Sequence, residues 1–186
     1  MKKPEEFLSG MTPTKNGFGF MFEELSFVCK GFIDYVKQCE KPVMNIACAY
    51  GVTTLPALEN SHVDMYALDI GQEHLDILWD NTPDSLRSRL HCQPGAFPDD
   101  FDFAGNSIDA IHIGNLVHFF QGPVIEASLA KCMQWLTPGG RLFIAVGYLL
   151  MLPVYTLKSS YLIWQSMSAL QPQVNLGPGL LRTSIR

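Results

Sequence analysis

A short apolar run, VMNI from Val43, leads into the small residues ACAYG ending at Gly51 and then into a segment with helical spacing. This pattern predicts a buried strand, a tight loop and a helix N-terminus, an arrangement that presents backbone N–H groups to a ligand. A second apolar run, Val63–Leu68, ends in Asp69 about twenty residues further on. An acid at the end of the neighbouring strand is placed to accept hydrogen bonds from two ribose hydroxyls. The two features together predict a ligand that contains a nucleoside.

Strand-like and helix-like segments alternate along the rest of the chain. Further strands are expected at Arg89–Gln93, Ser107–Ile113 and Arg141–Gly147, the last after a turn at Pro138-Gly139-Gly140. Helices are expected at Phe20–Gln38, after Thr53, around Leu75–Trp79 and at Pro123–Leu136. Strands that are continuous apolar runs are buried on both faces, so the sheet should be mostly parallel and flanked by helices. The sequence therefore predicts a Rossmann-like, doubly wound α/β fold.

The carboxyl ends of all parallel strands lie along one edge of such a sheet, and the ligand belongs at that edge. Four separately located segments fall there: Gly51, Asp69, the loop after Gln93, and Gly114-Asn115. Their convergence is a stronger indication of a site than any single glycine pattern.

Composition limits the function classes. The 186 residues suit a single domain with a sizeable core, and the net charge of −5 argues against non-specific nucleic-acid binding. Five cysteines without CxxC spacing indicate reduced thiols in a cytoplasmic protein. Residues 1–10 do not have the pattern of a signal peptide, and the apolar stretch 149–170 is interrupted by polar residues, so no membrane span is expected.

We expect one domain over residues 1–186, with three parts: an N-terminal lid and helix (1–40), a ligand-binding core (41–147), and a C-terminal helix, at about 155–170, with a tail (148–186). In the first part, Phe18 and Phe20 lie near the predicted loop and are candidates for a lid, whereas Phe22 is expected in the core.

No metal site is predicted. The five histidines show no ligand spacing with each other or with cysteine, and the acidic run Asp99, Asp100 and Asp102 is interpreted as a solvated loop. Among the histidines, His118 is the best candidate for a catalytic base because it follows the fourth strand on the ligand edge. The competing interpretation, a packing or solvent-exposed histidine, is favoured over it.

With these residues in place, the chain resembles the class I S-adenosylmethionine-dependent methyltransferases from about Phe20 to Gly147. VMNIACAYG stands where that family has an apolar pair, an acid and alternating glycines. YALDIGQEHLDIL resembles its ribose-binding strand end, NSIDAIHIGNLVHFF its fourth strand, and LTPGGRLFI its turn into the fifth strand. The resemblance implies S-adenosyl-L-methionine as cofactor and S-adenosyl-L-homocysteine as product. It assigns cofactor binding to Asn45, Ala47, Cys48, Ala49, Gly51, Asp69, Ile70, Ala96, Phe97, Gly114 and Asn115.

The sequence departs from the family pattern at several of these positions. Asn45 replaces the usual acid, and Ala47 and Ala49 replace two glycines, each adding a Cβ that disfavours positive φ. Ala96 stands where the family often has an acid that meets the adenine amino group, which leaves backbone contacts there. No pair of alternating strands follows the fifth strand, so the family's C-terminal hairpin is expected to be reduced or missing.

Methyl transfer mainly requires alignment of nucleophile, methyl and sulfur, so the resemblance supplies no universal catalytic residue. The first hypothesis is a methyltransferase acting on a small molecule, favoured over a protein acceptor, with no nucleic-acid substrate. The second is a binding or regulatory protein that kept the fold but lost catalysis. A third, an NAD-dependent oxidoreductase, has Asp69 in its favour but lacks a Tyr-Lys pair at familiar spacing.

Overall fold

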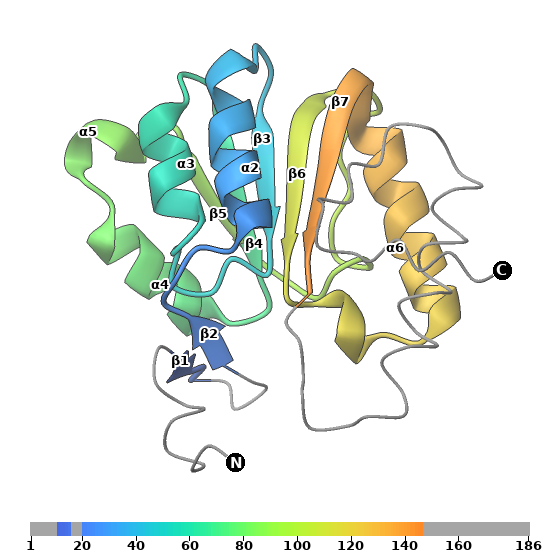
Figure 1. The fold of residues 1–186 in the computed structure, drawn as a ribbon, viewed down its shortest axis with the longest axis horizontal. Coiled ribbons are helices and arrows are strands. Elements are labelled where there is room, and N and C mark those ends of the chain that lie inside the picture. Colours follow the sequence, from blue (N-terminus) through green and yellow to red (C-terminus); the bar gives the residue numbers. More distant parts are fainter. Residues whose placement is uncertain (1–10, 16–19, 147–186) are drawn as a thin grey trace, which may run out of the picture.

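Five parallel strands form the central sheet of the computed structural model, which describes residues 11–15 and 20–146 (Figure 1). The strand order is β5-β4-β3-β6-β7, and every pairing in it is parallel. The strands are β3 (Val43–Ile46), β4 (Met65–Asp69), β5 (Leu90–Pro94), β6 (Ile108–Gly114) and β7 (Leu136–Ala145). The predicted Rossmann-like parallel sheet is confirmed.

Helices cover both faces of this sheet. They are α2 (Phe27–Tyr35), α3 (Thr54–Asn60), α4 (Gln72–Asn81), α5 (Asp84–Arg87) and α6 (Gly122–Trp135), with short 3-10 helices at Val36–Gln38 and Val117–Phe119. Side chains of β3 alternate between the faces: Val43 packs in the core under α2, α3 and α4, whereas Met44 packs in the core under α6. This alternation explains why the strand is apolar along its length.

The N-terminal helix is shorter than the sequence spacing predicts. Phe20–Phe22 forms β2, which pairs antiparallel with β1 (Met11–Pro13), and the helix begins only at Phe27. Ser26 caps it, because its Oγ accepts the Cys29 N–H at 3.2 Å and so satisfies a backbone donor of the first turn. The core placement of Phe22 is wrong, since this side chain is 39% exposed on the hairpin.

The fifth strand differs from the expected Arg141–Gly147. β7 already begins at Leu136, which pairs with Ile108, and its register shifts before Arg141 pairs with Ala110. The expected turn is therefore an irregularity inside a longer strand, where Gly139 takes a left-handed φ of 87°. The predicted C-terminal helix and the expected loss of the terminal hairpin concern residues outside the described part.

β3 occupies the centre of the sheet, with β4 on one side and β6 on the other. The connections run in opposite directions from these two neighbours, so the gap between the carboxyl ends of β3 and β6 is the topological switch point where ligands bind in such folds. These ends lie at the lower edge in Figure 1, where the β1–β2 hairpin also lies. None of the described helices has the length and apolar character that a membrane span requires.

Candidate functional site at the carboxyl edge of the sheet

The loop between β3 and α3 has three left-handed residues at alternating positions. The φ angles of Ala47, Ala49 and Gly51 are 57°, 45° and 89°. The sequence predicts that alanine disfavours this conformation, and the structure shows that both alanines nevertheless adopt it. Each then carries a cost of about 1 kcal/mol relative to a residue without a Cβ. The backbone of the glycine-type loop is therefore retained without its first two glycines.

Gly51 is fixed by packing as well as by its φ. A Cβ at this position would lie 2.3 Å from Cδ1 of Leu78 on α4. The Gly51 N–H donates to the Cys48 carbonyl at 3.0 Å, and its own carbonyl accepts the Leu55 N–H at 2.8 Å, the first turn of α3. The loop thus closes tightly against α4 and starts α3 at the switch point.

Asp69 ends β4 beside this loop and is 7% exposed. Its Oδ2 accepts the Ala49 N–H at 2.8 Å, and its Oδ1 accepts both the Gly71 N–H at 2.9 Å and His74 Nδ1 at 2.8 Å. Two carboxylate oxygens offer about four acceptor positions, so three are filled. Among the described residues, no donor occupies the fourth position, which is on Oδ2.

His74 was not among the residues predicted for the site. It is 2% exposed on the first turn of α4, and a Cβ on Gly71 would lie 3.0 Å from its Nδ1. Because a carboxylate only accepts, Nδ1 must donate to Asp69. Within the described part of the chain, Nε2 of His74 has no hydrogen-bond partner. The signal in the sequence is its position, five residues after Asp69 and just before the apolar residues of the expected helix.

Tyr50 joins the loop to the N-terminal hairpin. Its ring packs edge-on against His74 at 5.1 Å between centroids. Its hydroxyl donates to the Pro13 carbonyl at 3.3 Å and accepts the Lys15 N–H at 2.9 Å. The segment that includes β1 is therefore held over the loop by one side chain.

Asn45 lies on β3 with 1% of its surface exposed. Its Nδ2 donates to Thr54 Oγ1 at 2.8 Å, and its Oδ1 lies 2.7 Å from His112 Nδ1 on β6. Both ends of the amide, which stands where the family usually has an acid, are thus hydrogen-bonded inside the protein. Burial lowers the pKa of His112 to about 4, so its ring is neutral at neutral pH.

The predicted adenine side consists of residues from two loops. Ile70 is 59% exposed directly after β4, whereas Phe97 is 8% exposed and its side chain packs against Trp135 in the core. The Ala96 N–H, one of the expected backbone contacts, donates to Asp100 Oδ2 at 2.7 Å. Asp100 therefore brings a carboxylate to the loop in which the family's usual acid is replaced.

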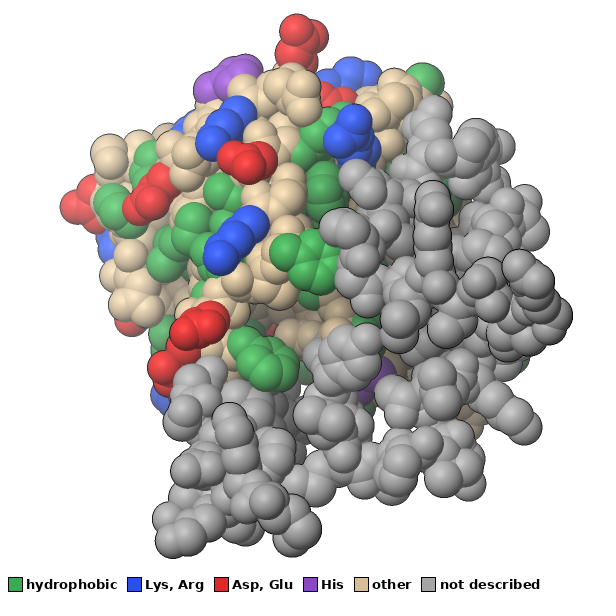
Figure 2. All heavy atoms as spheres, in the orientation of Figure 1, with side chains coloured by type: hydrophobic (Ala, Val, Ile, Leu, Met, Phe, Trp, Pro, Cys, Tyr) green, Lys and Arg blue, Asp and Glu red, His purple; other side chains and the backbone are tan. Residues whose placement is uncertain are grey.

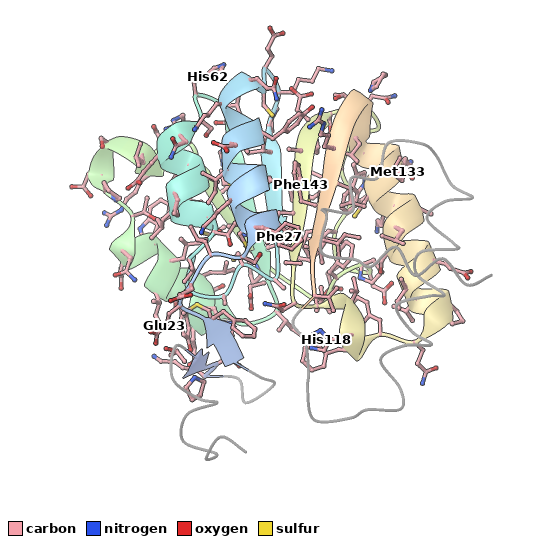
Figure 3. The ribbon with its side chains drawn as sticks, in the orientation of Figure 1. Glu23, Phe27, His62, His118, Met133 and Phe143 are labelled. Carbon is pink, nitrogen blue, oxygen red and sulfur yellow. The ribbon has the colours of Figure 1, made fainter. Side chains whose placement is uncertain are left out.

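The end of β6 lies close to the loop. A Cβ on Gly114 would lie 3.3 Å from the Ala47 carbonyl, and Asn115 has a left-handed φ of 48° with its N–H bonded to Ala145 at 2.8 Å. His118 follows in a 3-10 helix and is exposed, with its ring tilted against that of Phe119 at 4.1 Å between centroids, and partial burial lowers its pKa. Figure 3 shows His118 at the carboxyl edge and His62 at the opposite end of the sheet.

The charged side chains on the face drawn in Figure 2 are of both signs. On the face drawn in Figure 2, Lys and Arg side chains lie among acidic ones, without a basic patch among the coloured residues. No three His, Cys, Asp or Glu side chains of the described residues are grouped as metal ligands would be.

Comparison with known proteins agrees with this geometry. Residues 43–140, more than half of the chain, match the model of a family described as "Methyltransferase domain". The sequence matches none of the curated proteins with which it was compared.

Solved structures share the fold at low identity. They include an S-adenosyl-L-methionine-dependent methyltransferase of Methanococcus maripaludis, described as putative (TM-score 0.55, 19% identity, covering 65% of this chain and 54% of that one). Phosphoethanolamine N-methyltransferase 1 of Haemonchus contortus aligns with TM-score 0.55 and 15% identity, covering 64% of this chain and 25% of that one. The cyclase SpnF aligns with TM-score 0.55 and 14% identity, covering 63% and 43%. The chain thus spans about half, or less, of the length of these proteins.

Proposed function

Because this chain belongs to the methyltransferase domain family, we propose that it binds S-adenosyl-L-methionine at the carboxyl edge of its sheet and transfers the methyl group to an acceptor. The observation that carries the proposal is the Asp69 carboxylate, held at the end of β4 by the N–H of Ala49 from the neighbouring loop at 2.8 Å. This contact joins the two parts of the proposed nucleoside site, the end of β4 and the loop that follows β3. The open position on Oδ2 suits one ribose hydroxyl.

The other proposed cofactor contacts lie along the same edge of the sheet. Ile70 is exposed where an adenine ring would lie beside the ribose, and the left-handed loop of Ala47 and Ala49 would approach the methionine end. S-adenosyl-L-methionine supplies an activated methyl on a sulfonium, and an acceptor atom that takes it leaves S-adenosyl-L-homocysteine. The protein then has to align the acceptor and exclude water.

We favour a small-molecule acceptor over a protein or nucleic acid. The net charge of −5 argues against a nucleic-acid substrate, because phosphate binding requires a basic surface, and the coloured residues on the face drawn in Figure 2 form no basic patch. The β1–β2 hairpin, held to Tyr50, is proposed as part of a lid formed by residues 1–40, in line with the lid expected from Phe18 and Phe20. His118 remains a candidate base, exposed at the edge and kept neutral by its lowered pKa.

An inactive binding protein is the alternative function. Asn45, Ala47, Ala49 and Ala96 motivate it, yet both loop alanines, Ala47 and Ala49, hold the left-handed conformation that the loop needs. The two alanines therefore do not by themselves change the backbone conformation of the loop. The fold is also shared by the cyclase SpnF, so the reaction has to be tested separately from binding.

The test is calorimetric titration with S-adenosyl-L-methionine and S-adenosyl-L-homocysteine. We expect micromolar affinity, about −8 kcal/mol, and a loss of at least about tenfold in Asp69→Ala. Asp64→Ala is the matched control, because Asp64 lies just before the opposite end of the same strand. No binding by folded wild-type protein, or equal affinity in both variants, would refute the site.

Asp69 accepts three internal hydrogen bonds, so a second variant is needed in case Asp69→Ala does not fold. Ile70→Glu then decides, since this exposed position can take a charge without core disruption and the charge would oppose adenine binding. Release of S-adenosyl-L-homocysteine during incubation with small-molecule acceptors would distinguish an enzyme from a binding protein.

A further inference from the structure

A continuous run of polar side chains crosses the switch point under α2. Cys29 Sγ lies 3.6 Å from His112 Nε2, His112 Nδ1 lies 2.7 Å from Asn45 Oδ1, and Asn45 Nδ2 donates to Thr54 Oγ1 at 2.8 Å. His112 and Asn45 are neighbours in the register of β6 and β3 and are 2% and 1% exposed. Cys29 lies at the outer end of the run and is partly exposed. The run thus consists of a thiol, an imidazole and a side chain that orients the imidazole, in this order.

The hydrogen bonds determine which nitrogen of His112 carries the proton. Because the Asn45 amide group donates to Thr54, its carbonyl oxygen faces His112 and must accept, so Nδ1 of His112 carries the proton. The ring is neutral at neutral pH because burial lowers its pKa to about 4. Nε2 therefore presents a lone pair to Cys29 Sγ and is positioned to take the thiol proton.

The sulfur also has a hydrogen-bond donor beside it. The Ser26 hydroxyl donates to Cys29 Sγ at 3.2 Å, while its oxygen accepts the Cys29 N–H at 3.2 Å. Cys29 is in the first turn of α2, where the helix dipole favours negative charge. A base on one side and a donor on the other are the two groups that cleavage of an O–O bond by a thiol requires.

The other cysteines have different surroundings. Burial raises the pKa of Cys39 and Cys132 to about 12 and that of Cys92 to about 11, and it raises the pKa of Cys48 as well. The sulfurs of Cys39 and Cys48 contact backbone carbonyls, at 3.6 Å and 3.8 Å, which cannot accept and hold a proton as an imidazole does. Cys92 is partly exposed like Cys29 and so provides a comparison within the same molecule.

We propose that Cys29 is a nucleophilic thiol that reacts with hydroperoxides, assisted by His112 and Ser26. As Sγ attacks the terminal peroxide oxygen, the thiol proton passes to His112 Nε2. An S–O bond forms and the O–O bond breaks, so that Cys29 is oxidised to a sulfenic acid and the peroxide is reduced. The leaving oxygen takes the proton of the Ser26 hydroxyl and departs as water or an alcohol. His112 then releases the thiol proton to water, and Ser26 regains a proton from water, so that both side chains return to their starting states.

The test treats the full chain with hydrogen peroxide at pH 7, traps sulfenic acid with dimedone and identifies the labelled peptides by mass spectrometry. We expect Cys29 to be labelled at least about tenfold faster than Cys92. His112→Gln should slow labelling of Cys29 by about tenfold. A more basic imidazole would accelerate the reaction by a larger factor, but burial lowers the pKa of His112. Asn45→Asp should accelerate it, because a carboxylate on Nδ1 makes Nε2 more basic.

Ser26→Ala distinguishes the proposed chemistry from a structural role. It should slow the reaction with peroxide, whose leaving oxygen needs a proton, but leave alkylation by iodoacetamide little changed, because iodide leaves without one. Equal labelling of Cys29 and Cys92, or an unchanged rate in folded His112→Gln, would overturn the proposal. If His112→Gln does not fold, Ser26→Ala decides, and equal effects on peroxide and iodoacetamide would overturn it.

Discussion

The two faces of the sheet are built from different chemistry. Under α6 the core consists of apolar side chains apart from the buried Ser128, with Ile111 and Ile113 of β6 packed among aromatic residues that include Trp135. Under α2, α3 and α4 the core is apolar at the amino end of the strands but polar at their carboxyl end, where Asn45, His112 and Asp69 are buried. Each of these three is hydrogen-bonded to another element.

Because of this difference, substitutions on the two faces of the sheet should affect different properties of the protein. Burial of polar groups costs free energy unless their hydrogen bonds are satisfied. A buried polar cluster is therefore retained only where the neighbouring elements supply its hydrogen-bond partners. We therefore expect substitutions under α6 to change stability alone. Substitutions at the carboxyl end under α2 should change stability, proton binding and ligand binding together.

The largest effect is expected from Trp135→Ala. This side chain is fully buried and contacts Phe103 at 5.1 Å between ring centroids, so its removal should lower the free energy of unfolding by about 4 kcal/mol. The control is Trp79→Ala, since Trp79 is 40% exposed on α4 and should cost less than about 1 kcal/mol. Urea denaturation measures both. Similar losses in the two variants would contradict the assignment of the α6 core.

His112 should make stability depend on pH. Its pKa is about 4 in the folded protein against 6.5 in a free chain, so the unfolded state binds more protons between these values and stability falls as the pH falls from 6.5 to 4. The loss amounts to about 3 kcal/mol. Denaturation at several pH values should show a weaker pH dependence in His112→Gln.

The matched control is His62→Gln, because His62 is exposed at the opposite end of the sheet. Its pH dependence should equal that of the wild type. If both variants titrate alike, His112 is not buried in the neutral form.

The smallest effect concerns the loop alanines. Ala47→Gly and Ala49→Gly should each raise the free energy of unfolding by about 1 kcal/mol, because glycine adopts φ of 57° and 45° without strain. Ala57→Gly is the control: this residue lies inside α3, where glycine should cost about 1 kcal/mol. Thermal unfolding resolves the sign. Destabilisation by all three substitutions would show that the loop is not strained at its alanines.

Much of the fold could be predicted from the sequence because its signals are local. Continuous apolar runs at Val43 and Val63 predict buried strands, and glycine with an acid at their ends predicts where the edge of the sheet lies. The helix beginning at Phe20 could not be predicted correctly. Apolar residues at helical spacing continue through Phe22, and only pairing with Met11–Pro13 makes that segment a strand.

The sequence by itself determined the parallel sheet, the alternation of its strands and helices, and the positions of Gly51 and Asp69 at its carboxyl edge. The tertiary structure decided how those residues are used, because hydrogen bonds between strands depend on register and face. His112 shares a face with Asn45 only through the pairing of β6 with β3, and α2 brings Cys29 to it from 83 residues away in the chain. No local sequence pattern relates residues so far apart in the chain, so the polar run under α2 can be recognised only in the folded molecule.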